Sequence, residues 1–167
     1  MVCINTKAVN VSAASAEVSV RASSGQVSKG DIVYVIITVN SSDAMSGFEG
    51  SFSYDSRVLQ YMTGGSIASG NDNRFQIEDT GRETGVNSLK YSIKFVARKE
   101  GSTSIELKQP YAVYNSEDSS KMSVSSDTLN IMVKSKSAKK ADAPQKNDNK
   151  EPDGKEPVSY THLTLPT

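Results

Sequence analysis

Hydrophobic and polar residues alternate with a period of two over most of residues 17–133, a pattern that is typical of strands in a sheet. The most apolar segment is residues 32–39 (IVYVIITV), whose many β-branched residues disfavour a helix. Because both faces of this segment are apolar, the pattern predicts a central strand that is covered on both sides.

Two further segments predict strands with one buried and one solvated face. Residues 47–54 (GFEGSFSY) place Phe48, Phe52 and Tyr54 on one face and polar side chains on the other. In residues 88–95 (SLKYSIKF) apolar side chains alternate with serine and lysine in the same way. Turn residues separate these and shorter apolar segments at intervals of about 8–12 residues, and no segment has a convincing helical period. We therefore expect an all-β fold, an antiparallel β-sandwich of about eight or nine strands over residues 17–134.

The amino-acid composition excludes more classes of function than classes of fold. The chain has 167 residues with one cysteine (Cys3) and one histidine (His162), so an intramolecular disulfide is excluded. Histidine and cysteine supply many catalytic bases, nucleophiles and transition-metal ligands, so we expect no enzyme, no cofactor and no metal centre. Residues 71–73 (NDN) offer the oxygen ligands that Ca²⁺ prefers, but we favour an ordinary polar turn there.

The net charge is zero only because an acidic excess in one region of the chain is cancelled by a basic excess elsewhere. Lysine and arginine number 19, as do aspartate and glutamate, so the net charge is zero and argues against a nucleic-acid binder. Residues 17–133 carry 11 basic and 14 acidic side chains, whereas residues 134–157 carry seven lysines and five acids. No run of 18 apolar residues occurs, so we expect no membrane span.

The two ends of the chain differ from the predicted sandwich. Residues 1–16 finish on a small-x-small triplet (ASA), so we interpret them as a leader or the remnant of an export signal. Residues 135–157 are rich in lysine, acids and proline and predict a disordered linker. Residues 158–167 (VSYTHLTLPT) look like a translated sequencing-adapter peptide, and we interpret them as an artefact or a disordered tail.

Four segments in the central region resemble parts of a cohesin domain. Residues 30–33 (GDIV) open a strand, Phe52-x-Tyr54-Asp55 closes the next one, and Val58-Leu59 follows directly. Residues 91–107 (YSIKFVARKEGSTSIEL) resemble the strand, glycine turn and strand that come later in the family. The resemblance covers residues 17–133 and implies a jelly-roll type of sandwich. By alternation, Phe52 and Tyr54 are core positions and Asp55 ends a strand, so this motif is a signature of the fold.

The resemblance also implies a function and a binding face. Cohesins bind dockerin modules and so assemble polysaccharide-degrading enzymes on bacterial surfaces, which implies an extracellular, non-catalytic module with a dockerin-like partner. In the family, the outer face of the strand that ends in F-x-Y-D carries an Asn and an Asp two residues apart. Gly47 and Glu49 hold these positions here.

The partner-binding residues that we predict comprise two groups. The first is Gly47, Glu49, Ser51 and Ser53, and the second is Ser88 and Lys90, which lie on a polar face whose relation to the first stays open.

Two alternatives to protein binding remain at this point. One is a carbohydrate-binding module that uses Tyr111 and Tyr114, although their spacing of three predicts opposite faces, one in the core and one at the surface. The other is a structural spacer domain in a long surface protein, which the linker fits equally well.

Overall fold

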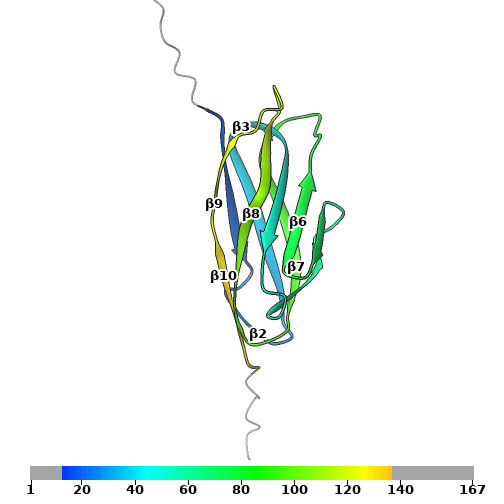
Figure 1. The fold of residues 1–167 in the computed structure, drawn as a ribbon, viewed down its shortest axis with the longest axis vertical. Helices are drawn as coiled ribbons and strands as arrows, with labels where there is room; N and C mark the ends of the chain where they lie inside the picture. Colours follow the sequence, from blue (N-terminus) through cyan, green and yellow to red (C-terminus); the bar gives the residue numbers. More distant parts are fainter. Residues whose placement is uncertain (1–12, 137–167) are drawn as a thin grey trace, which may run out of the picture. The chain divides into compact units, whose positions relative to one another are not determined.

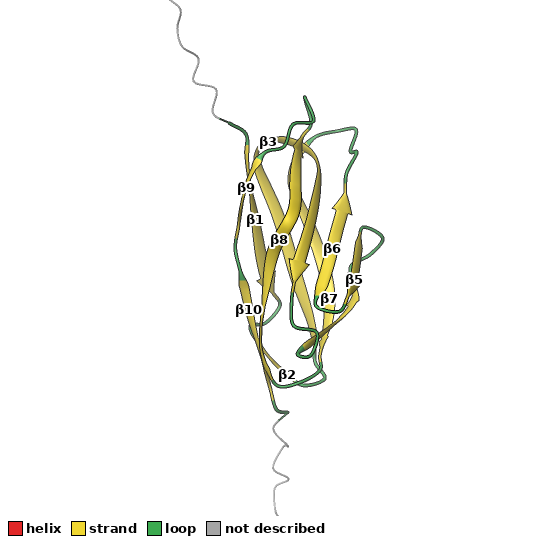
Figure 2. Ribbon diagram, viewed as in Figure 1, coloured by secondary structure: helices red, strands yellow, loops and turns green. Residues whose placement is uncertain are grey.

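The computed structural model describes residues 13–136, which form one β domain without helices (Figures 1 and 2). The predicted terminal segment 158–167, most of the predicted linker and residues 1–12 of the predicted leader lie outside the described residues. Ten strands make up the domain: β1 (Ser15–Ala22), β2 (Gln26–Ser28), β3 (Ile32–Ser53), β4 (Leu59–Thr63), β5 (Ala68–Asn71), β6 (Arg74–Asp79), β7 (Val86–Ala97), β8 (Gly101–Asn115), β9 (Ser123–Ser126) and β10 (Leu129–Lys134).

The strand β3 belongs to both layers of the sandwich (Figure 1). Its first half pairs with β1 and β7, and its second half, from Gly47 onward, pairs with β6 and β8. Met45, between the two halves, pairs with both β7 and β8. The register shifts between Asn40 and Met45, where the strand bends from one layer to the other. We call the two layers the β7 layer (β9, β1, first half of β3, β7, β4) and the β8 layer (β2, β10, β8, second half of β3, β6, β5). Pairing is antiparallel except between β1 and β9 and between β2 and β10.

The core lies between the two layers and is built by the predicted alternation. Val33, Val35, Ile37 and Val39 of β3 are fully buried on one side of the β7 layer. Phenylalanine and tyrosine rings from both layers meet them, and the aromatic contacts involve Phe48, Phe52, Tyr54, Tyr61, Phe75, Tyr91 and Phe95. The all-β sandwich expected from the sequence is therefore confirmed.

The expectation that residues 32–39 are covered on both faces is wrong. The segment is central within its layer, since β1 and β7 flank it, but Ile32 is 50% exposed and Tyr34 is 44% exposed. Only the inner face of the β7 layer packs against a second layer, so the apolar side chains on the outer face meet solvent. A continuous apolar run can therefore be a half-covered strand in an antiparallel sheet.

The NDN segment forms the hairpin turn between β5 and β6. Asn71 pairs with Arg74 across the turn, and Asn73 adopts a positive φ of 65°, a conformation that asparagine tolerates better than most residues. The carbonyl of Asn71 accepts a hydrogen bond from the Tyr54 hydroxyl (2.7 Å). The segment therefore has the role of an ordinary polar turn that is tied to the core.

Candidate functional site

The second half of β3 runs along the middle of the β8 layer and turns every second residue outward. Phe48, Gly50 and Phe52 face the core, while Glu49, Ser51 and Ser53 face away from it. In the neighbouring β6, Gln76 lies opposite Ser51, and Glu78 lies opposite Glu49. The outer face of the β8 layer is thus a polar surface with two carboxylates side by side.

Gly47 also faces outward on β3, but the backbone of a neighbouring segment covers it. A Cβ atom added at Gly47 would lie 2.5 Å from the carbonyl oxygen of Asp79 and 2.6 Å from the Cα of Thr80. The end of β6 and the first loop residue therefore lie directly over this position. Where the cohesin resemblance leads one to expect an asparagine, the chain has a buried glycine.

Ser88 and Lys90 lie on the opposite side of the domain. Both belong to β7, where they pair with Asn40 and Thr38 in the first half of β3. Ser88 donates a hydrogen bond to Oδ1 of Asn40 (2.8 Å), and Lys90 is exposed. The structure thus brings Glu49, Ser51 and Ser53 together on the outer face of the β8 layer. It places Ser88 and Lys90 on the outer face of the β7 layer.

A bulge in β8 turns part of the polar face into a groove. Gly50 pairs with Tyr111 and Ser51 with Lys108, so Gln109 and Pro110 have no partner on β3. The groove beside this bulge has a volume of about 320 Å³ and is lined by Glu49, Gly50, Ser51, Gln76, Ile77, Glu78, Pro110, Tyr111, Ala112 and Lys121. Sequence reasoning missed it, although a proline inside a strand-like run is a known signal for a bulge.

Two polar groups in this groove have unusual surroundings. The Glu49 carboxylate accepts a hydrogen bond from the Tyr114 hydroxyl (2.9 Å), and this bond raises the pKa of Tyr114. Ser51 is only 2% exposed, and its hydroxyl oxygen has no hydrogen-bond partner among the described residues. A buried hydroxyl without a partner costs free energy, so a ligand or a water molecule bound in the groove that Ser51 lines would stabilise it.

The expectation that one of Tyr111 and Tyr114 belongs to the core is wrong. Both side chains are half-buried, and neither belongs to the core of the sandwich. Tyr111 directly follows the bulge, where the regular alternation of the strand is interrupted, and it lines the groove. Tyr114 does not line the groove, but its hydroxyl donates a hydrogen bond to Glu49, which does.

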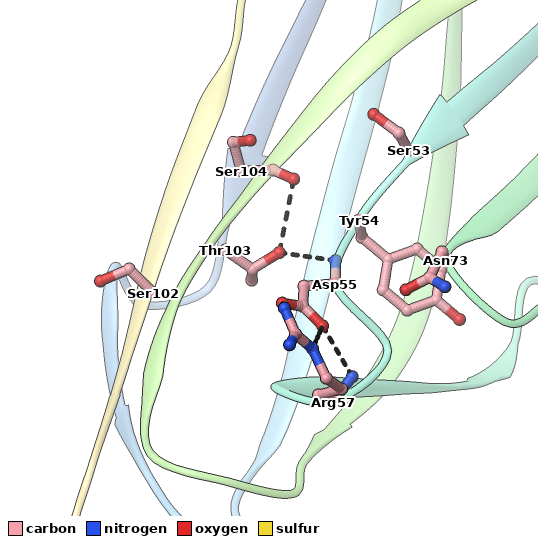
Figure 3. Close-up of a pocket in the computed structure, with 8 residues that line it drawn as sticks. All are labelled: Ser53, Tyr54, Asp55, Arg57, Asn73, Ser102, Thr103 and Ser104. Atoms are coloured by element: carbon pink, nitrogen blue, oxygen red, sulfur yellow. Dashed lines mark hydrogen bonds and ion pairs between the residues drawn. The ribbon is translucent and has the colours of Figure 1, made fainter.

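A second depression lies at the end of β3, around Asp55 (Figure 3). The Asp55 amide donates to the Thr103 hydroxyl (2.9 Å), and the Asp55 carboxylate accepts the Arg57 amide (2.9 Å) and the Arg57 guanidinium (2.7 Å). Here Figure 3 shows Arg57 folded back onto Asp55. These contacts close the turn after β3 and attach it to β8, so the F-x-Y-D motif acts as a fold signature, as expected.

Replacing Arg57 with alanine should raise the pKa of Asp55 toward the ordinary carboxyl value. Hydrogen bonds from Arg57 hold the pKa of Asp55 below that value in the folded protein. Because the folded pKa is lowered, the ionised form stabilises the fold above the unfolded pKa, and this contribution is lost as pH falls through the folded pKa. Titration of the carboxyl carbon by NMR measures the change. Arg82→Ala, whose guanidinium pairs with Asp79 instead, is the control and should leave the Asp55 titration unchanged.

Within residues 13–136, no group of three or more histidine, cysteine, aspartate or glutamate residues could hold a metal ion. That part of the chain also has no helix that could cross a membrane.

The arrangement of these strands is similar to that of a class of β-sandwiches, the cohesin domains. No family model matches the sequence, and no curated protein matches it. Among solved structures, a non-cellulosomal cohesin from Archaeoglobus fulgidus is 16% identical and has a TM-score of 0.59, with 73% of this chain and 93% of that chain covered. A chain of a type I cohesin–dockerin complex from Clostridium thermocellum is 12% identical and has a TM-score of 0.55, with 78% and 99% covered.

A type II cohesin domain from the cellulosome of Acetivibrio cellulolyticus is similar to the same region. It is 17% identical and has a TM-score of 0.53, with 70% of this chain and 95% of that chain covered. Nearly the whole length of each of these domains is therefore matched. Residues 13–136 have a cohesin-like fold, which confirms the resemblance found in the sequence.

Proposed function

We propose that this domain is a non-catalytic binding module that recruits a dockerin-type protein partner through the outer face of its β8 layer. The observation that carries the proposal is the cohesin-like fold, since some of the similar structures were solved as cohesin–dockerin complexes. From the same similarity we infer a role outside the cell, in surface attachment or in an assembly of polysaccharide-degrading enzymes. A fold determines a function only through its sites, so the proposal depends on the face described above.

The chemistry of the β8 face suits a partner that presents hydrogen-bond donors. Glu49 and Glu78 lie opposite each other on adjacent strands, an arrangement in which like charges repel. Donors from a partner, either hydroxyl or basic groups, would relieve this repulsion and orient the complex. Ser53 adds a further polar side chain along the same strand, whereas the buried Gly47 adds none.

Reversing the charge of Glu49 should weaken partner binding at least tenfold. Glu49→Arg removes an acceptor from the middle of the face and puts a bulky cation in its place. The measurement is surface plasmon resonance of the purified domain against a panel of type I and type II dockerin modules. A dockerin that binds the native domain and the Glu49→Arg variant equally well would show that Glu49 lies outside the interface.

Lys90→Glu provides the matched control for this experiment. It is a charge reversal of the same size on an exposed strand position, but on the opposite layer. We expect it to leave dockerin binding unchanged. Loss of binding in Lys90→Glu with full binding in Glu49→Arg would move the interface to the β7 layer, and binding to no dockerin in the panel would contradict the proposed function.

A further inference from the structure

We propose that the groove beside the β8 bulge is a carbohydrate-binding site that accepts a neutral sugar ring. This inference goes beyond the proposed function, because it assigns a second class of ligand to a particular part of the β8 face. It rests on three independent features of the groove: a buried hydroxyl without a partner, a mixture of hydrogen-bonding groups of both charges, and an aromatic ring beside a proline.

The first feature is Ser51 at the floor of the groove. Its hydroxyl is the buried side-chain oxygen that lacks a hydrogen-bond partner among the described residues. Gln76 lies directly opposite Ser51 on β6, and both residues line the groove. A ligand hydroxyl that enters here can provide the missing hydrogen bond, and that would recover part of the cost of burying the group.

The second feature is the pattern of charge around the groove. Glu49 and Glu78 are acceptors, Lys121 is a donor, and Gln76 is both. The Lys121 ammonium group would repel a cationic ligand, and the carboxylates of Glu49 and Glu78 would repel an anionic one. A neutral ligand with many hydroxyl groups can donate to the acids and accept from the amide and the ammonium group, so it matches this mixture best.

The third feature is an apolar wall. Tyr111 and Pro110 stand next to each other at the bulge, and both line the groove. Tyrosine combines a large apolar ring surface with a polar end, so the C–H face of a sugar ring can pack on it while the hydroxyl groups reach the polar floor. The groove volume of about 320 Å³ falls at the lower end of the range for small-molecule sites, which suits a single ring of a longer glycan.

The test is affinity electrophoresis of the domain in gels that contain barley β-glucan, xyloglucan, glucomannan or arabinoxylan. We expect at least one of these glycans to retard the native domain. Tyr111→Ala and Ser51→Ala should each raise the dissociation constant for that glycan at least fivefold, and Ser51→Ala does so while leaving the packing of the face almost intact. Tyr34→Ala, which removes an exposed tyrosine from the opposite layer, is the matched control and should leave the retardation unchanged.

Three results would overturn the inference: no retardation by any of the four glycans, loss of retardation in Tyr34→Ala, or full retardation in both groove variants. Binding of a lysine-rich peptide to the groove without any glycan binding would assign the site to a basic protein segment and would overturn it as well. The dockerin panel is a separate measurement, so sugar binding and dockerin binding can fail independently. Where both occur, a saturating oligosaccharide of the retarding glycan should weaken dockerin binding, because the groove lies within the proposed interface.

Discussion

Replacement of Phe75 by alanine is expected to lower the free energy of unfolding by about 3–5 kcal/mol, the usual cost of removing a buried phenylalanine. Phe75 is 1% exposed and lies on β6, where its ring stacks on Phe52 of β3 with a centroid distance of 5.0 Å. It also meets Phe95 of the opposite layer edge to face at 5.6 Å. The ring therefore holds the two layers together, and its loss leaves a cavity that both layers line.

Urea denaturation followed by circular dichroism measures this change. Tyr34→Ala is the control, because that ring is 44% exposed on the outer face of the β7 layer, and we expect it to cost less than about 1 kcal/mol. A Phe75→Ala variant as stable as the Tyr34→Ala variant would mean that the layers close around the missing ring.

Replacement of Gly47 by asparagine is expected to destabilise the domain by about 2–3 kcal/mol, although it restores the residue that the cohesin resemblance implies. The new Cβ would lie 2.5 Å from the carbonyl oxygen of Asp79 and 2.6 Å from the Cα of Thr80. Both neighbours are backbone atoms, so the loop after β6 has to move away from β3 before the side chain fits. The hydrogen bond from the Arg82 amide to the carbonyl of Ser46 (3.0 Å) opposes that movement.

The midpoint of thermal unfolding for Gly47→Asn, compared with that for Gly25→Asn, tests this prediction. A Cβ at Gly25 would meet no atom within 4 Å, and Gly25 has no positive φ, so that substitution is expected to have little effect. Equal midpoints for the two variants would indicate that the loop after β6 is not held against β3. In that case an asparagine at position 47 could take part in partner binding.

Alternation alone predicted most of this fold. The period of two in residues 47–54 and 88–95 correctly placed Phe48, Phe52, Ile93 and Phe95 in the core, because inward-facing side chains in a sandwich have to be apolar. The same rule failed for the outer face of residues 32–39. Whether a second layer covers an apolar face depends on the arrangement of the other strands, which a local pattern does not contain.

The candidate site was predicted only in part, and the physical reason is the bulge. Alternation placed Glu49, Ser51 and Ser53 on one outer face, and the structure brings them together there. The alternation gave no sign that Gln109 and Pro110 leave the pairing with β3 and so create a groove beside Ser51. Nor could it tell which layer Ser88 and Lys90 belong to, because that depends on which half of β3 pairs with β7.

The continuity of β3 limits how the length of this sequence can change during evolution. One strand of 22 residues supplies a central member to both layers. An insertion or deletion of a single residue within either half would exchange inward and outward side chains along the rest of that half, so core valines or phenylalanines would face solvent. Residues 42–44, where the strand bends between the layers, are the part of β3 in which a change of length need not shift either register. We therefore expect relatives of this domain to vary in length there and in the β8 bulge, and to keep constant spacing within the two halves.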